Sequence, residues 1–304
     1  MPQGSVLGPI LFLIYINDMI YSSSKFKYVI YADDTTLLLA NKNIHTLYSD
    51  LCSELSIINN WIKYNRLKLN IAKTKYILFQ NRSITNTLPP ILLEGTLIER
   101  VKYSKFLGVY IDEYLNWNNH IEEVCLKLSR VCGILYRVRN NLTTDAMMSI
   151  YYTLCYPYIN YCISVWGCTW PSFLEKLVVT QKKIIRCMFF LGKFDSTVDI
   201  FIAYNLLNVH SIQKYFLLLT IFRTLINSEF HHFHFVDSQY TTRGNNINLQ
   251  CPRFRTTLFK NSILCHGPHV WNALPRDVKN LILTKNLSRF KNMVKQYLRA
   301  PQNI

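Results

Sequence analysis

The sequence predicts an α+β protein, in which a small antiparallel sheet with helices is followed by an all-helical region. Two short apolar runs on either side of Asp33 and Asp34 predict a β-hairpin, and two further extended segments follow it. Beyond residue 118, apolar residues recur every three or four positions, which places them on one face of a helix. Half of the 304 residues are hydrophobic, so the chain is long enough for two packed units.

The N-terminal part is expected to form a helix, the hairpin and a second helix. Apolar residues run from Ile10 to Ile16 after Pro9, and proline is favoured in the first turn of a helix because its missing N–H is not needed there. The hairpin is expected over 26–40. Over 43–64 an apolar stripe at helical spacing is formed by Ile44, Leu47, Leu51, Leu55, Ile58 and Trp61.

The later elements follow from the same patterns. Short extended segments are expected at 76–79 and 106–111, and a polar loop from about 229 to 256. Helices are expected around the stripe from 121 to 135 and at 144–156, 172–190, 211–227 and 286–299.

The distribution of charge indicates the kind of partner. The chain has 34 Lys and Arg against 18 Asp and Glu, a net charge of +16. Residues 1–115 hold 12 basic and 9 acidic side chains, whereas residues 116–304 hold 22 and 9. This excess favours a polyanionic partner, although an anionic membrane surface would also attract it. No apolar run has the roughly 18 residues that a membrane span requires.

The nine cysteines are scattered, with no Cys-x-x-Cys pair and no signal peptide, which indicates a reducing compartment. Cys251, Cys265, His266 and His269 form the one cluster to consider for zinc, but structural zinc usually has more closely paired ligands. For His231, His232 and His234 a polar loop is the simpler interpretation.

Asp33 and Asp34 are the residues that most clearly indicate a chemical function. Nucleotidyl transfer uses two divalent cations about 3.5–4 Å apart, one activating the attacking hydroxyl and one holding the triphosphate. Magnesium prefers carboxylate oxygens together with phosphates and waters, and a tight hairpin would hold two adjacent acids rigidly. The alternative is an ordinary turn, since aspartate is common in turns.

The surrounding sequence favours the catalytic interpretation. YADD (31–34) follows PQGSVLGPILFLIYIND (2–18), and together they resemble motifs B and C of reverse transcriptases, in particular those of non-LTR (jockey-like) retrotransposons. RLKLNIAKTKYILF (66–79) resembles motif D, and FLGVYIDEYLNWNNHI (106–121) resembles the segment after the palm. YPYINYCISVWG (156–167) and GPHVWNALP (267–275) are similar to stretches of the same open reading frames.

The resemblance implies a fold and an activity. The expected domains are a partial polymerase palm with motifs B to E (1–115), a helical thumb-like domain (116–228) and a basic C-terminal tail (229–304). The implied activity is RNA-directed DNA polymerisation with Mg²⁺, using an RNA template, a DNA primer and deoxynucleoside triphosphates. It also implies an intracellular protein that acts in the nucleus and not at a membrane.

The resemblance also implies roles for single residues. Asp33 is expected to be a metal ligand and Asp34 its less essential neighbour, with Tyr31 and Ala32 under the primer end. Lys73 is expected near the departing pyrophosphate, where a cation offsets developing charge; its alternative is a solvated lysine at a strand edge.

Two further groups are expected to contact the substrates. Gln3, Gly4 and Ser5 would line the pocket where the template base meets the incoming nucleotide. Leu107 and Gly108 would belong to the turn that grips the primer.

In the second half, aromatic residues alternate with basic ones that could neutralise phosphates. The candidate nucleic-acid-binding residues are Lys182, Lys183, Arg186, Arg253 and Arg255. The alternative is an ordinary helical domain with a charged solvent face.

The match begins at motif B, so we expect a fragment without the fingers and without the earlier palm strand that carries a third metal-binding aspartate. Its two-metal site would be incomplete and the isolated chain inactive. Two rival functions stay open: a non-catalytic RNA-binding relic, and a maturase-like RNA cofactor.

Overall fold

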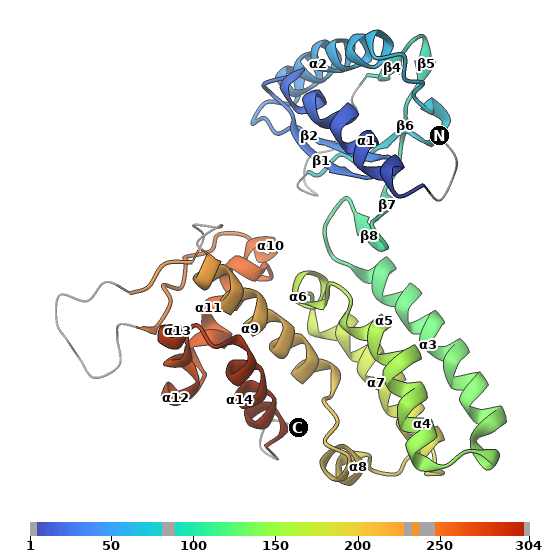
Figure 1. Ribbon diagram of the computed structural model, residues 1–304, viewed down its shortest axis with the longest axis vertical. Helices are drawn as coiled ribbons and strands as arrows, with labels where there is room; N and C mark the ends of the chain where they lie inside the picture. The colour runs from blue at the N-terminus through green and yellow to red at the C-terminus, as the bar shows by residue number, and fades with distance from the viewer. Residues whose placement is uncertain (1–4, 81–88, 228–232, 237–246, 301–304) are drawn as a thin grey trace. The chain divides into compact units, whose positions relative to one another are not determined.

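The computed structural model describes residues 5–80, 89–227, 233–236 and 247–300 (Figure 1). The chain divides into two compact units, Met1–Ser104 and Lys105–Ile304. Short strands and helices occur in the first unit, whereas helices dominate the second, so the expected mixed α+β class is confirmed. The division lies ahead of the boundary expected at residue 115, and the second unit includes both regions that were expected to be separate domains.

The first unit begins with helices around a hairpin: α1 (Leu7–Ile16), η1 (Asn17–Tyr21), β1 (Lys27–Tyr31), β2 (Asp34–Leu38) and α2 (Ile44–Tyr64). Helix α2 starts where Asn43 accepts hydrogen bonds from the backbone N–H groups of His45 and Thr46, which otherwise have no partner in the helix. Its apolar stripe packs against α1 and the hairpin in a small core formed by Ile16, Met19, Phe26, Ile58 and Ile62. The expected hairpin and second helix are therefore confirmed.

The rest of the first unit consists of very short elements: η2 (Ile71–Lys73), β3 (Lys75–Tyr76), β4 (Leu92–Leu93), β5 (Thr96–Leu97) and β6 (Glu99–Arg100). Strand β3 pairs in parallel with β6, and β4 pairs with β5 across a tight turn. The extended segment expected at 76–79 was therefore wrong in extent, because only Tyr76 of that range lies in a strand.

The second unit opens with a short hairpin and continues as helices: β7 (Tyr103–Phe106, whose first two residues precede the boundary), β8 (Val109–Asp112), α3 (Asn118–Val138), η3 (Arg139–Asn141), α4 (Thr144–Ile150), η4 (Tyr151–Cys155), α5 (Tyr156–Asn160), α6 (Ile163–Trp166), α7 (Pro171–Met188), α8 (Val198–Ala203), α9 (Val209–Asn227), α10 (Thr257–Lys260), α11 (Ile263–Asn272), α12 (Arg276–Lys279), α13 (Leu281–Thr284) and α14 (Leu287–Arg299). The helices expected around 121–135 and at 172–190, 211–227 and 286–299 are confirmed within one or two residues at most ends.

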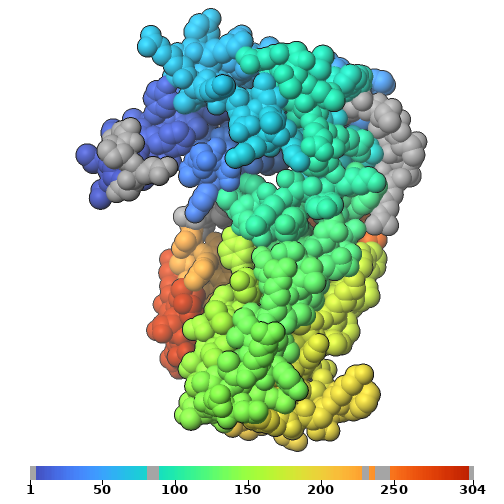
Figure 2. Space-filling model, turned by 90° about the vertical axis from the view of Figure 1, so that its right-hand side faces the viewer, coloured from blue at the N-terminus to red at the C-terminus, as the bar shows by residue number. Residues whose placement is uncertain are grey.

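One continuous core holds this unit together. Helices α3 and α7 lie side by side (Figures 1 and 2) and bury the predicted stripe, with Ile121, Leu128 and Leu135 fully inaccessible to solvent. Helix α9 packs against α6, α11 and α14. There the rings of Phe222 and Phe290 are stacked with their centroids 4.0 Å apart.

The helix expected at 144–156 is interrupted by η4, a π-helical turn, and continues to Asn160. Pro157 explains the interruption, because it has no N–H for the next α-helical hydrogen bond. The backbone N–H of Tyr156 accordingly donates to the carbonyl of Tyr151, five residues earlier. The expected polar loop contains an isolated bridge between Phe235 and Leu249 in its described parts.

Among the helices of the described residues, none combines the length and the apolar character that crossing a membrane requires.

Candidate active site

The candidate site is the tip of the hairpin β1–β2. Tyr31 pairs with Asp34, which leaves Ala32 and Asp33 as a two-residue loop. Ala32 has φ +51°, and a positive φ is what the first loop residue of a two-residue hairpin turn of either primed type requires. Glycine would adopt this φ without strain, whereas alanine is disfavoured there by roughly 1–2 kcal/mol. The hairpin register therefore holds the tip in a conformation that the loop sequence does not favour.

Both carboxylates at this tip face solvent. Asp33 and Asp34 are exposed, and so is Tyr31, which is 64% accessible. Within the described part of the chain neither carboxylate forms an ion pair with a lysine or arginine. The acids are therefore free to bind a cation from solution.

Carboxylate oxygens are suitable ligands for magnesium, but two carboxylate groups form only part of a two-cation site. Among the residues that the structure describes, no group of three or more His, Cys, Asp or Glu side chains is placed to hold a metal ion. The donor set at the hairpin tip thus fits the expected metal in kind and supplies a partial set of ligands.

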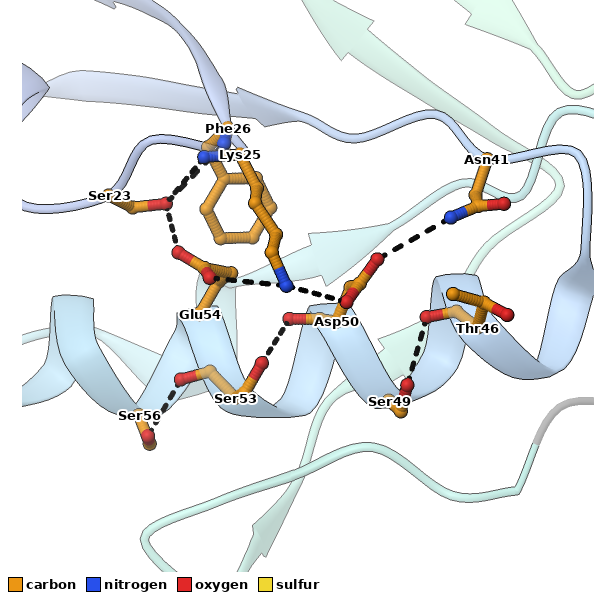
Figure 3. Close-up of polar contacts among 10 residues, drawn as sticks. All are labelled: Ser23, Lys25, Phe26, Asn41, Thr46, Ser49, Asp50, Ser53, Glu54 and Ser56. Carbon is orange, nitrogen blue, oxygen red and sulfur yellow. Dashed lines mark hydrogen bonds and ion pairs between the residues drawn. The ribbon is translucent and has the colours of Figure 1, made fainter.

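A polar network ties both ends of the hairpin to α2 (Figure 3). Before β1, Ser23 donates a hydrogen bond from its hydroxyl to Glu54, and Lys25 Nζ lies 2.7 Å from Asp50 Oδ1. After β2, the side-chain amide of Asn41 donates to Asp50 Oδ2 over 3.5 Å. The two acids of this network lie one turn apart on α2, so one helix fixes where the hairpin starts and where it ends.

The electrostatics of this network follow from its contacts. Lys25 also lies 3.8 Å from Glu54 Oε1, and Glu54 is only 6% exposed. The hydrogen bond to Asp50 is the main reason that the pKa of Lys25 is raised above its ordinary value. The sequence reasoning missed these positioning residues, although two acids four positions apart beside an otherwise apolar stripe were a visible signal.

The other candidates of the first unit are Lys73 and the segment with Gln3, Gly4 and Ser5. Lys73 ends η2 with its side chain exposed, and the side chain of Asn70 accepts a hydrogen bond from its backbone N–H. Among the described residues no hydrogen bond or ion pair joins Lys73 to the aspartates. Ser5 is half-buried, whereas Gln3 and Gly4 lie outside the described residues.

The candidate primer-gripping turn connects β7 and β8. Leu107 and Gly108 have φ of +45° and +88°, the signs of a type I′ hairpin turn. The hydroxyl of Tyr161, at the end of α5, donates to the carbonyl of Leu107 over 2.6 Å. The same ring lies 3.4 Å from the position that a Cβ on Gly108 would occupy. A helix terminus therefore holds this turn closely.

The basic candidates on α7 differ in availability. Lys183 is exposed and Lys182 is half-buried. Arg186 donates from Nε to the carbonyl of Asp195 over 2.9 Å, so part of its guanidinium holds the loop after the helix. These three basic side chains of α7 therefore do not form one uniform patch.

The candidates near the C-terminus lie in an exposed segment. Arg253 and Arg255 are exposed on either side of Phe254, and Lys260 Nζ lies 5.6 Å from the centroid of that ring, a cation–π contact. Cys251 Sγ lies 3.7 Å from His269 Nδ1. In the described part of the chain these residues complete no metal-binding group.

The remaining cysteine and histidine candidates for zinc lie in two groups. Cys265 is buried with its Sγ 4.0 Å from the carbonyl of Pro252, and burial lowers the pKa of His266. Neither feature indicates zinc. His231 and His232 lie outside the described residues, and His234 lies beside the bridge to Leu249.

Comparison with known proteins finds a family similarity in the N-terminal part of the chain. Residues 1–111 match the family model described as reverse transcriptase (RNA-dependent DNA polymerase). An RNA-directed DNA polymerase from the mobile element jockey of Drosophila melanogaster is 30% identical over 196 residues, which is 61% of this chain and 21% of the relative. A probable RNA-directed DNA polymerase from transposon BS of the same species is 26% identical over 197 residues, 62% of this chain and 22% of the relative. No solved structure matches the chain.

The hairpin with two exposed acids lies within residues 1–111, the part of the chain that is similar to the reverse transcriptase family. The chain is related to the RNA-directed DNA polymerases of jockey-like, non-LTR retrotransposons, as its motifs had implied. It spans about a fifth of the length of the curated relatives it matches.

Proposed function

We propose that the chain takes part in RNA-directed DNA synthesis, with the β1–β2 hairpin as its metal-binding element. The observation that carries this proposal is the YADD tip, where Asp33 and Asp34 are exposed and free of basic partners in the described chain. The family match over the same residues supports this interpretation.

In the proposal, Asp33 and Asp34 hold Mg²⁺ with ligands from the substrates. Magnesium, when bound, would lower the pKa of the attacking 3′-hydroxyl and neutralise the triphosphate. Tyr31 would support the primer end from the exposed face of β1. Lys73, exposed at the end of η2, would offset charge on the departing pyrophosphate.

The remaining assignments follow from the same proposal. The first unit would be part of a polymerase palm and the second unit a thumb with a basic tail, acting in the nucleus on an RNA template and a DNA primer. Gln3, Gly4 and Ser5 would border the nucleotide. Leu107 and Gly108 would touch the primer, and Lys183, Arg253 and Arg255 would contact phosphates from their exposed positions.

Metal binding gives the most direct test, because two carboxylates supply only part of a two-cation site. We expect the 304-residue chain to bind Mn²⁺, observed as loss of the free-ion electron paramagnetic resonance signal, and Asp33→Asn to weaken this binding at least tenfold. Asp18→Asn, which removes another exposed acid of the same unit, is the matched control. Equal Mn²⁺ binding by all three proteins would reject the metal-site assignment.

Primer extension on an RNA template tests the activity itself. Magnesium-dependent incorporation that Asp33→Asn abolishes would support polymerisation. Because the isolated chain is expected to be inactive, absence of extension alone does not separate the candidates. RNA binding and Mn²⁺ binding that are both unchanged by Asp33→Asn would favour a non-catalytic RNA-binding protein or a maturase-like RNA cofactor, in keeping with the incomplete ligand set among the described residues.

A further inference from the structure

A small cavity of the second unit is lined by none of the candidate site residues. Its volume is ≈ 40 Å³, and its polar lining comes from η4, α5, the segment after α8 and the last helix, α14. The polar lining residues are Tyr151, Tyr152, Tyr156, Asn205, Lys295 and Arg299. A single water needs about 10–15 Å³ of such space, so the cavity has room for roughly three water-sized groups.

The lining is cationic and rich in hydrogen-bond donors. Lys295 and Arg299 contribute two positive charges, and no carboxylate is among the lining residues that the structure describes. Arg299 Nε is buried, and no hydrogen-bond partner for it occurs among the described residues. Since a buried N–H of a charged group is costly to leave unpaired, this atom calls for an acceptor that the described chain does not supply.

The tyrosines add neutral donors to the two cations. Burial raises the pKa of Tyr156 to about 12 and also raises the pKa of Tyr152, so both hydroxyls keep their protons at neutral pH. Tyr151 accepts a hydrogen bond from Gln181 Nε2 over 2.9 Å, which leaves its own proton for another acceptor. Among the polar side chains that line the cavity, hydrogen-bond donors therefore outnumber acceptors.

The π-helical turn explains why three tyrosines meet there. In η4 the hydrogen bond spans five residues, so Tyr151 and Tyr156 come to lie near one another instead of diverging around an α-helix. The ring centroids of Tyr151 and Tyr152 are 5.4 Å apart, and those of Tyr152 and Tyr156 are 5.6 Å apart. Pro157 thus creates one wall of the cavity and α14 supplies the charged wall.

We propose that this cavity binds one phosphate group. A compact anion with several acceptor oxygens matches a cavity lined by an arginine, a lysine and three tyrosines, with no carboxylate among the described lining residues. The phosphate could be free or could belong to the backbone of a bound nucleic acid, and both sources have the same chemistry at the site. The proposal does not rest on the hairpin or on polymerase activity.

Protection by inorganic phosphate tests the site itself. At constant ionic strength, replacing chloride by phosphate is expected to raise the melting temperature of the full chain by a few degrees, and Arg299→Gln is expected to abolish this shift. Arg289→Gln is the matched control, because Arg289 lies on the same helix but is exposed. Lys295→Gln is a second variant in case Arg299→Gln does not fold, and it is expected to reduce the shift at least by half.

Two results would overturn the proposal. One is a melting temperature of the unmodified chain that is the same in phosphate and in chloride. The other is a phosphate-dependent shift that the folded cavity variants retain in full, because the ion would then bind elsewhere on a basic protein.

Binding of single-stranded RNA in chloride buffer separates the two sources. If the cavity takes a backbone phosphate, inorganic phosphate competes with RNA, and Arg299→Gln weakens RNA binding about tenfold while Arg289→Gln does so much less. If it takes free phosphate, Arg299→Gln removes the thermal protection and leaves RNA affinity equal to that of Arg289→Gln. Each pattern supports the phosphate site and identifies its source.

Discussion

The two units use charge in opposite ways. The first exposes a pair of acids at a hairpin tip, over two small clusters of buried apolar residues. The second has one continuous core that runs from α3 to α14, and it places cationic side chains around a partly enclosed cavity. A small core with an exposed acidic tip suits a metal site whose remaining ligands come from the substrates. A large core, in contrast, can hold a preformed anion site.

This comparison predicts that the second unit depends more strongly on single core residues. Phe222 is fully buried and stacked on Phe290, so Phe222→Ala is expected to lower the free energy of unfolding of the second unit by about 3–5 kcal/mol. Hydrogen exchange followed by mass spectrometry would show the loss in α9 and α14, with residues 23–64 unaffected. Phe194→Ala, at a ring that is 88% exposed, is the control and should cost less than about 0.5 kcal/mol. Equal deprotection of both units would contradict the comparison.

The second unit should also lose stability in acid. His120 is 4% exposed, accepts a hydrogen bond from the backbone N–H of Tyr110, and lies with its ring centroid 5.1 Å from that of Trp166. Burial, helped by the charge of Lys127, lowers the pKa of His120 to about 4 from the ordinary 6.5. The unfolded chain therefore takes up this proton first as the pH falls. Stability that is complete above pH 6.5 should be lost progressively toward pH 4, by about 3 kcal/mol in all.

Denaturant titrations between pH 7.5 and pH 4 measure this dependence. Because carboxylates titrate in the lower part of the same range, the informative quantity is the difference between the unmodified chain and His120→Phe. We expect the variant to have the shallower decline. Parallel curves for the two proteins would show that His120 is protonated in the folded state as easily as in the unfolded state.

In the first unit, the stability of the hairpin should depend on the polar network that joins it to α2. Glu54→Ala leaves the hydroxyl of Ser23 without its buried acceptor and removes one partner of Lys25, so we expect a loss of about 1–3 kcal/mol. Hydrogen exchange should accelerate across β1 and β2, and Mn²⁺ binding at the tip should weaken although no ligand has changed. Glu99→Ala, at an exposed acid paired with Lys75, is the matched control. Unaltered exchange in the hairpin would show that the network does not position it.

The contrast between the units also separates what the sequence could predict from what it could not. The hairpin around Asp33 and the helix over 44–64 follow from patterns a few residues long, and both were predicted. The contacts of Ser23 with Glu54 and of Asn41 with Asp50 were not, because they join residues whose proximity depends on packing. The π-helical turn was missed for a different reason: an apolar period indicates helix but does not distinguish an i→i−4 from an i→i−5 hydrogen bond.

The smallest expected effect concerns the turn at the start of the second unit. Tyr161→Phe removes only the hydroxyl that donates to the carbonyl of Leu107 and keeps the ring that covers Gly108, so a loss of about 0.5–1.5 kcal/mol is expected. Tyr136→Phe, at an exposed tyrosine of α3, controls for the loss of a hydroxyl. If the turn grips a primer, Tyr161→Phe should also weaken binding of a primer–template duplex more than binding of single-stranded RNA, measured by fluorescence anisotropy. Equal effects on the two ligands would leave the turn as a structural hairpin and would place the duplex contacts of this unit elsewhere.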